Sequence, residues 1–161
     1  MKPDVQANID NCKDDLNKIW HLIEGIGTIN PISGYLTRFA LIRICGTLEV
    51  CYKSIIADYY EAFSPELQRY IGIHVREASL NAQYNSISKV LGEFSEEKCR
   101  LFKTRISSLE NKEQVITAMS DLNTARNEVA HGYSTTMSFN EMKQKFNDSL
   151  IIIDNLCEVL S

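Results

Sequence analysis

Hydrophobic side chains recur at every third or fourth position along most of this chain, which is the spacing of one face of an α-helix. The first such stretch runs from about Val5 to Ile26, and a longer one runs from about Gly34 to Ala62. The longer stretch is apolar on more than one face, as helices at the centre of a bundle usually are. The apolar positions are Ile9, Cys12, Leu16, Ile19, Trp20 and Ile23 in the first stretch, and Phe39, Ile42, Leu48, Val50, Ile55 and Ile56 in the second.

Serine residues at three places predict the starts of further helices. Ser64 precedes a proline and a glutamate and opens a helix to about Glu77, and Ser95 caps a helix after a short one that ends near Phe94. Ser138 and Glu141 form a capping box before the last helix. In the helix after Ser95 we expect these side chains to point inward: Cys99, Leu101, Phe102 and Ile106.

No stretch alternates between apolar and polar residues as a half-buried strand does. A further helical pattern runs from about Lys112 to His131, and residues 34–62 also read as helix throughout. The chain has no repeat, linker or low-complexity segment. We therefore predict an all-α fold, a bundle of long antiparallel helices that forms a single domain over residues 1–161.

Composition limits the classes of function that this chain can have. The 161 residues are 44% hydrophobic and carry a net charge of −4, so any contact with RNA must be local and cannot rest on bulk charge. The five cysteines are scattered and odd in number, which favours reduced thiols in the core. The first residues, MKPDVQANIDN, contain no apolar run, and the longest aliphatic run is only Leu150 to Ile153. We expect a cytoplasmic protein without a signal peptide or a membrane span.

An arginine precedes a histidine by five positions at two places, Arg69 to His74 and Arg126 to His131. Five residues rotate by roughly 140° around an α-helix, so mid-helix the two side chains cannot easily share a target. The Arg69 pair sits in a helix that continues beyond it. We interpret that pair as a surface arginine and a half-buried histidine.

The second pair lies in the stretch RNEVAHGY, which ends its helix. Gly132 suits the left-handed position just past a helix end, where the chain turns and the two side chains of Arg126 and His131 can converge. The negative end of the helix would favour the protonated form of His131. A basic residue in the last turn followed by glycine is also ordinary helix-stop chemistry, and spacing leaves both interpretations open.

The stretch LNTARNEVAHGY resembles the R-N-x-x-x-H signature of the HEPN superfamily. Two further stretches resemble its RiboL-PSP-HEPN branch: RFALIRICGTLEVCYKSII is similar to the long early helix, and NAQYNSISKVLGEF to an asparagine-rich joint followed by a short helix. The likeness covers about residues 34–160 and includes the order of the elements. It implies a HEPN-like helical bundle.

The resemblance also implies a function. Many HEPN proteins are metal-independent ribonucleases that act as dimers, often as the toxin or effector of a toxin–antitoxin or antiphage defence system. The implied catalytic residues are Arg126 and His131, and the implied partners are RNA, a second copy of the chain, and an antitoxin or other defence-system protein. Two alternatives stay open: a non-catalytic HEPN module that dimerises or docks a partner, and an unrelated helical scaffold.

Four other residues match the family's pattern, and each has a plainer interpretation. Asn127 would orient the site or contact RNA, and its plainer interpretation is a polar surface residue. Glu49 would line the implied active-site cleft, and its plainer interpretation is an ion pair with the lysine four residues on. Arg43 would add positive charge there, or simply be exposed. Tyr133 matches a tyrosine that accepts adenylyl groups in some HEPN toxins. Its plainer interpretation is a loop tyrosine that packs on the bundle.

We expect no metal and no other cofactor. The three histidines have no ligand-like spacing to cysteines or carboxylates, and the chain has no glycine-rich phosphate loop. The basic cluster KCRLFKTR, from Lys98 to Arg105, could guide RNA or balance the acidic residues beside it, and we favour the second interpretation.

Overall fold

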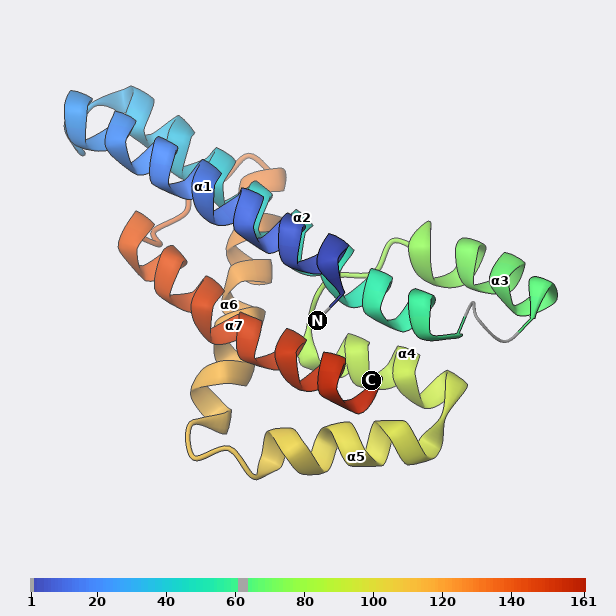
Figure 1. Ribbon diagram of the computed structural model, residues 1–161. Coiled ribbons are helices and arrows are strands. Elements are labelled where there is room, and N and C mark those ends of the chain that lie inside the picture. Colours follow the sequence, from blue (N-terminus) through green and yellow to red (C-terminus); the bar gives the residue numbers. More distant parts are fainter. Residues whose placement is uncertain (1, 61–63) are drawn as a thin grey trace.

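The computed structural model describes residues 2–60 and 64–161, and over these residues the protein is built from helices without a strand. Figure 1 shows α1 and α2 side by side and antiparallel, α7 running along them, and α6 crossing behind α7. The all-α prediction is confirmed. The elements are α1 (Pro3–Ile26), α2 (Pro31–Tyr60), α3 (Pro65–Ile71), a π-helical turn (Gly72–Arg76), α4 (Tyr84–Phe94), α5 (Glu96–Ser107), α6 (Lys112–Ala130) and α7 (Phe139–Val159).

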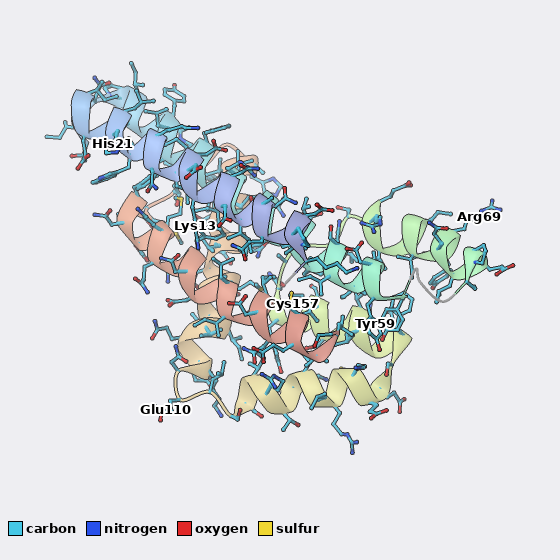
Figure 2. The ribbon with its side chains drawn as sticks, viewed as in Figure 1. Lys13, His21, Tyr59, Arg69, Glu110 and Cys157 are labelled. Atoms are coloured by element: carbon cyan, nitrogen blue, oxygen red, sulfur yellow. The ribbon has the colours of Figure 1, made fainter. Side chains whose placement is uncertain are left out.

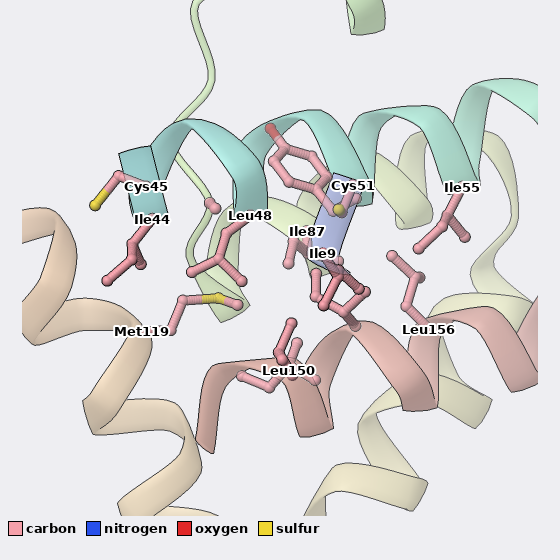
Figure 3. Packing of buried hydrophobic residues seen from close by; sticks show 14 of the residues in the cluster. Ile9, Ile44, Cys45, Leu48, Cys51, Ile55, Ile87, Met119, Leu150 and Leu156 are labelled. Carbon is pink, nitrogen blue, oxygen red and sulfur yellow. The ribbon is translucent and has the colours of Figure 1, made fainter. Parts of the chain in front are cut away.

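Helix α2 is the centre of the bundle. It packs against α1, α3, α6, α7 and the π-helical turn. In Figure 3 its side chain Leu48 points toward Met119 of α6 and Leu150 of α7, and Ile55 points toward Leu156 of α7. Although α2 has 30 residues, no helix in the described part of the chain has both the length and the apolar character needed to cross a membrane.

The predicted helix starts are confirmed. The hydroxyl oxygens of Ser64 and Ser95 accept hydrogen bonds from backbone N–H groups three residues on, at 3.1 and 3.2 Å. Ser138 does the same for the N–H of Glu141 at 3.2 Å. The second half of the predicted capping box does not form, because the Glu141 carboxylate pairs with Lys145 at 3.7 Å. The five cysteines are free thiols, and four of them are buried.

One helix ends differently from the prediction. The regular part of α3 ends at Ile71, and the chain continues through a π-helical turn to Arg76 rather than as one α-helix to Glu77. His74 lies in that turn and is exposed rather than half-buried. The predicted end of the second helix, Ala62, lies outside the described residues.

Some expected core residues are on the surface. Leu101 of α5 is exposed, because the inward face of this helix is formed by Cys99, Phe102 and Ile106. On α2 the side chains of Phe39, Ile42 and Val50 are exposed, while Leu48, Ile55 and Ile56 are buried. The second apolar face that the sequence shows on α2 is therefore present and lies uncovered.

Two neighbouring residues of α5 test this placement. Phe102 is fully buried and Leu101 is exposed. We expect Phe102→Ala to lower the free energy of unfolding by about 3–5 kcal/mol, because it removes a packed ring and leaves a cavity. Leu101→Ala should change it by less than about 1 kcal/mol. Chemical denaturation of both variants measures the difference, and equal effects would contradict the described face of α5.

Candidate active site

The end of α6 is built by two backbone hydrogen bonds that wrap the chain around Gly132. The N–H of Gly132 donates to the carbonyl of Val129 at 3.1 Å, and the N–H of Tyr133 donates to that of Glu128 at 2.9 Å. This pair of bonds is a Schellman motif, and its glycine has φ +85°, as the sequence predicts. His131 is the last residue before the glycine, so its backbone position is held by α6.

Arg126 lies in α6 about one turn before this end, and its side chain is half-buried. Its Nη2 donates a hydrogen bond to the side-chain oxygen of Asn81. Its Nε is buried and has no hydrogen-bond partner among the described residues. The guanidinium is thus anchored at one corner, and no carboxylate of residues 2–60 and 64–161 binds its remaining donors.

Asn81 belongs to a segment, residues 77–83, that crosses between α2 and α6. Tyr52 of α2 donates its hydroxyl to the carbonyl of Leu80 at 3.0 Å, and Lys53 donates to the carbonyl of Ala78. From the other side, the buried amide of Asn123 in α6 donates to the carbonyl of Ala82. These bonds fix the segment and with it Asn81.

Sequence reasoning missed Asn81 and Asn123. The asparagine-rich joint that contains Asn81 matches the family's pattern, but the sequence assigns Asn81 no role. A signal for Asn123 was available, since a polar residue stands three positions before Arg126 and thus on the same helix face. The partner carbonyl, however, lies 41 residues away in the chain, and no local pattern predicts that contact.

Cys45 of α2 faces α6, and Glu49 lies one helical turn further along α2. The Cys45 thiol donates to the carbonyl of Leu122 at 3.4 Å. Burial raises the pKa of this thiol to about 12, against the opposing influence of the Arg126 charge. The thiol is therefore protonated at neutral pH and is not a ready nucleophile. The Glu49 carboxylate pairs with Lys53 at 2.6 Å and keeps part of its surface exposed.

Arg43 lies on the other side of α2. Its guanidinium donates to the carboxylate of Asp15 in α1 at 2.9 Å and to the hydroxyl of Thr47 at 2.7 Å. Glu49 and Arg126 therefore both lie near enough to the Cys45 thiol to influence its pKa, whereas Arg43 is directed toward α1.

Three predicted site residues are exposed at the end of α6: Asn127, His131 and Tyr133. No hydrogen bond or ion pair joins Arg126 to His131 in the described structure, although Arg126 lies in the last turns of α6 and His131 at its end. The site contains the guanidinium and the imidazole that the motif predicts. How closely both approach a bound molecule depends on where that molecule docks.

A hollow of about 420 Å³ lies next to this loop. Ser134, Thr135 and Ser138 line one wall, and Thr37 and Arg38 of α2 line another. Trp20 and Phe139 stack at its apolar side, with ring centroids 5.3 Å apart. Arg38 is its one charged lining residue in the described chain, so the hollow suits a neutral or negatively charged group.

The other arginine–histidine pair is placed differently. Arg69 projects from α3 at the edge of the molecule (Figure 2), and the His74 ring packs on Tyr70 with centroids 4.2 Å apart. His21 lies near the far end of α1 and pairs with Glu24 at 3.4 Å. No group of three or more histidine, cysteine or acidic side chains gathers as a metal site within residues 2–60 and 64–161.

Half of the basic cluster on α5 is engaged with the C-terminal end of α7. Lys98 donates to the carbonyl of Val159 at 2.7 Å, and Arg105 pairs with Glu158 and Asn155. Lys98 and Arg105 thus have structural partners, but these partners lie on α7 rather than among the acidic residues beside the cluster.

The family model of RiboL-PSP-HEPN matches residues 7–161, and the chain belongs to this family. HEPN domains are all-α bundles that are associated with ribonuclease or nucleotide-binding functions, and they often bind RNA and dimerise. The comparisons with curated proteins and with solved structures find no significant match.

The fastening of the segment 77–83 can be tested at Asn123. We expect Asn123→Ala to lower the free energy of unfolding by about 1–3 kcal/mol, because it leaves the buried carbonyl of Ala82 without its donor. Asn127→Ala, an exposed asparagine on the same helix, should change it by less than about 0.5 kcal/mol. Urea denaturation distinguishes the two, and an unchanged midpoint for Asn123→Ala would mean that this bond does not hold the segment.

Proposed function

We propose that this protein is a metal-independent RNA endonuclease in which Arg126 and His131 are the catalytic residues. The observation that carries the proposal is the pairing of a half-buried, partly uncommitted guanidinium with an exposed histidine at a fixed helix end. Membership of a family of ribonuclease-related domains supports the same conclusion. The protein would act in the cytoplasm as a single domain.

Arg126 would hold the scissile phosphate. A guanidinium can form paired hydrogen bonds with phosphate oxygens and stabilise the charge that builds up on them in the transition state. Asn81 anchors one corner of the group and is thus a positioning residue. The buried Nε without a partner among the described residues supports this role, because a buried unpaired N–H requires an explanation and a bound ligand is one.

His131 would move protons. RNA carries its own nucleophile, so the 2′-hydroxyl oxygen attacks phosphorus while one histidine takes its proton. The bond from phosphorus to the 5′-oxygen breaks, and that oxygen receives a proton from a second acid. The products are a 2′,3′-cyclic phosphate and a 5′-hydroxyl, and no oxidant or cofactor is needed.

Two histidines are required if acid and base act together, and one chain supplies only His131 at this place. A two-fold dimer that directs both Arg126–His131 pairs into one cleft would supply them. Exposure of His131, with no hydrogen bond to Arg126 within the described chain, supports a site that a second copy completes.

Neighbouring residues would have supporting roles. Asn127 is exposed on α6 and would contact RNA, and Glu49 would line the cleft from α2. Arg43 would act on RNA only through long-range charge, because its side chain is bound to Asp15. Tyr133 has 68% of its surface exposed, so a modifying partner could reach its hydroxyl.

The biological role that fits this chemistry is that of a toxin or effector in a toxin–antitoxin or antiphage defence system, restrained by an antitoxin or another protein of that system. A second candidate is a non-catalytic docking module. The uncovered apolar side chains of α2 favour it, since they offer a surface to a partner with or without catalysis. Cleavage of RNA by the purified protein separates the two.

The catalytic pair can be tested against the second pair in the same chain. We expect Arg126→Ala and His131→Ala each to lower the rate of RNA cleavage roughly a hundredfold or more, the usual effect of losing one acid–base or charge-stabilising group. Arg69→Ala and His74→Ala should leave the rate nearly unchanged, because both residues are exposed on a different element. If the His74 variant is inactive while folded, the wrong pair has been chosen.

The mechanism predicts the ends of the product. Cleavage in excess chelator should continue and should leave a 2′,3′-cyclic phosphate and a 5′-hydroxyl, because the 2′-hydroxyl is the nucleophile. A substrate with 2′-deoxyribose at the cut position should bind and remain intact. End-group analysis of the products checks this. A 5′-phosphate, or activity that needs added magnesium, would show a metal-dependent mechanism instead.

A further inference from the structure

One face of α2 carries exposed apolar residues along most of its length. Their exposed fractions are 56% for Ile32, 66% for Tyr35, 55% for Phe39, 52% for Ile42 and 48% for Val50, with the exposed Gly46 between the last two. The spacings of three and four residues keep all six within roughly 80° of the helix surface. We call these six residues the α2 stripe.

The α2 stripe lies opposite the face that α2 buries in the core. It contains no charged residue, in a chain where 24% of residues are charged. Apolar side chains at three-and-four spacing form the seam by which two helices pair, each side chain fitting among residues of the other helix. No other element of the described structure covers these side chains, which leaves a partner from outside this chain.

We propose that the α2 stripe is the interface of a two-fold homodimer, in which α2 packs antiparallel against α2 of a second copy. The argument is that the stripe is complementary to itself. Phe39 and Gly46 lie equally far on either side of a point between Ile42 and Arg43, and so do Tyr35 and Val50. A two-fold axis beside that point places Phe39 of each chain against Gly46 of the other.

Size complementarity favours this register. A Cβ added at Gly46 would meet nothing within 4 Å in the single chain, so the fold itself does not require glycine there. A glycine in the middle of a helix costs about 0.5–1 kcal/mol relative to alanine. The space it leaves would receive the Phe39 ring of the second copy.

Charge complementarity agrees with size. Arg38 and Glu49 lie on the same flank of the α2 stripe, the one that faces α6 and the loop after it. They stand on opposite sides of the proposed axis, with Glu49 about half a helical turn farther from it than Arg38. In the antiparallel pair, the long side chain of Arg38 of each chain would therefore reach toward Glu49 of the other, beside the Glu49–Lys53 pair, at the edge of the apolar seam.

The geometry of the proposed dimer also determines on which side of it the two candidate active sites lie. The axis of an antiparallel helix pair is perpendicular to the plane of the two helices, so elements on one flank of α2 stay on one side of the dimer. Both α6 ends, with Arg126 and His131, would share that side, and both Arg43–Asp15 pairs would lie on the other. This step rests on the proposed function, whereas the interface itself does not.

The test introduces a charge at the seam. Phe39→Glu should raise the dissociation constant of the dimer roughly a hundredfold or more, because it buries an unpaired carboxylate twice. Leu101→Glu is the matched control: it replaces an exposed leucine on α5 and should leave the dimer intact. Light scattering and sedimentation measure the mass, and circular dichroism checks that both variants are helical.

A cross-link tests the register. Ile42→Cys should form a disulfide between two chains under mild oxidation, because these positions meet beside the axis, whereas Leu101→Cys should not. Gly46→Phe should break the dimer, and adding Phe39→Ala should restore much of it. A wild-type chain that is monomeric at every concentration, or that binds only a partner protein, overturns the proposal, as does a dimer that survives Phe39→Glu.

The outcomes separate this proposal from the proposed function. A dimer that Phe39→Glu dissociates, but that cuts no RNA, would retain the interface and refute the ribonuclease. A strict monomer that cuts RNA would retain the ribonuclease and refute the interface. If both hold, Phe39→Glu should lower cleavage together with dimer content, and higher protein concentration should recover both.

Discussion

The rest of this structure depends on the burial of one face of α2 along its 30 residues. That face packs against α1, α6 and α7, and the side chains it contributes, such as Leu48 and Ile56, are fully buried. Because α6 and α7 both pack on this one helix, the position of the α6 end relative to α2 is determined by core packing. The candidate site therefore inherits its geometry from the hydrophobic core.

The hydrophobic core places the helices only approximately, and polar contacts fix the finer details of the candidate site. The segment 77–83 has no regular structure, and its backbone would lie loosely without hydrogen-bond partners. Side chains of α2 and α6 supply partners for three of its carbonyl groups. A segment held in this way can present Asn81 to Arg126 in a constant position, as the proposed phosphate-binding role of Arg126 would require.

Packing within the single chain explains some of its groups and leaves some exposed side chains unexplained. Its core is complete, its five thiols are unpaired, and burial keeps the pKa of Cys45 and Cys51 at about 12. These groups are accounted for by packing. Several exposed apolar side chains lie together on one face of α2, and the exposed His131 lies at the end of α6. The proposed second copy would cover the first and complete the second.

The sequence alone determined the helices and the end of α6. Helix faces, caps and the glycine stop are local properties, set by residues within four positions of one another, and the structure confirms Ser64, Ser95, Ser138 and Gly132 in these roles. The sequence also identified Arg126 and His131 as the candidate pair, through a motif of consecutive residues.

Tertiary structure alone decided the long-range contacts. The pairing of Arg126 with Asn81, the support from Asn123 and the turn of Arg43 toward Asp15 join residues far apart in the chain. The sequence also left open which of the two apolar faces of α2 is buried, because both have the spacing of a helix face. A face becomes core only if another helix is available to cover it. Periodicity reports that a face is apolar, but the physical reason it is buried is the presence of another surface against it.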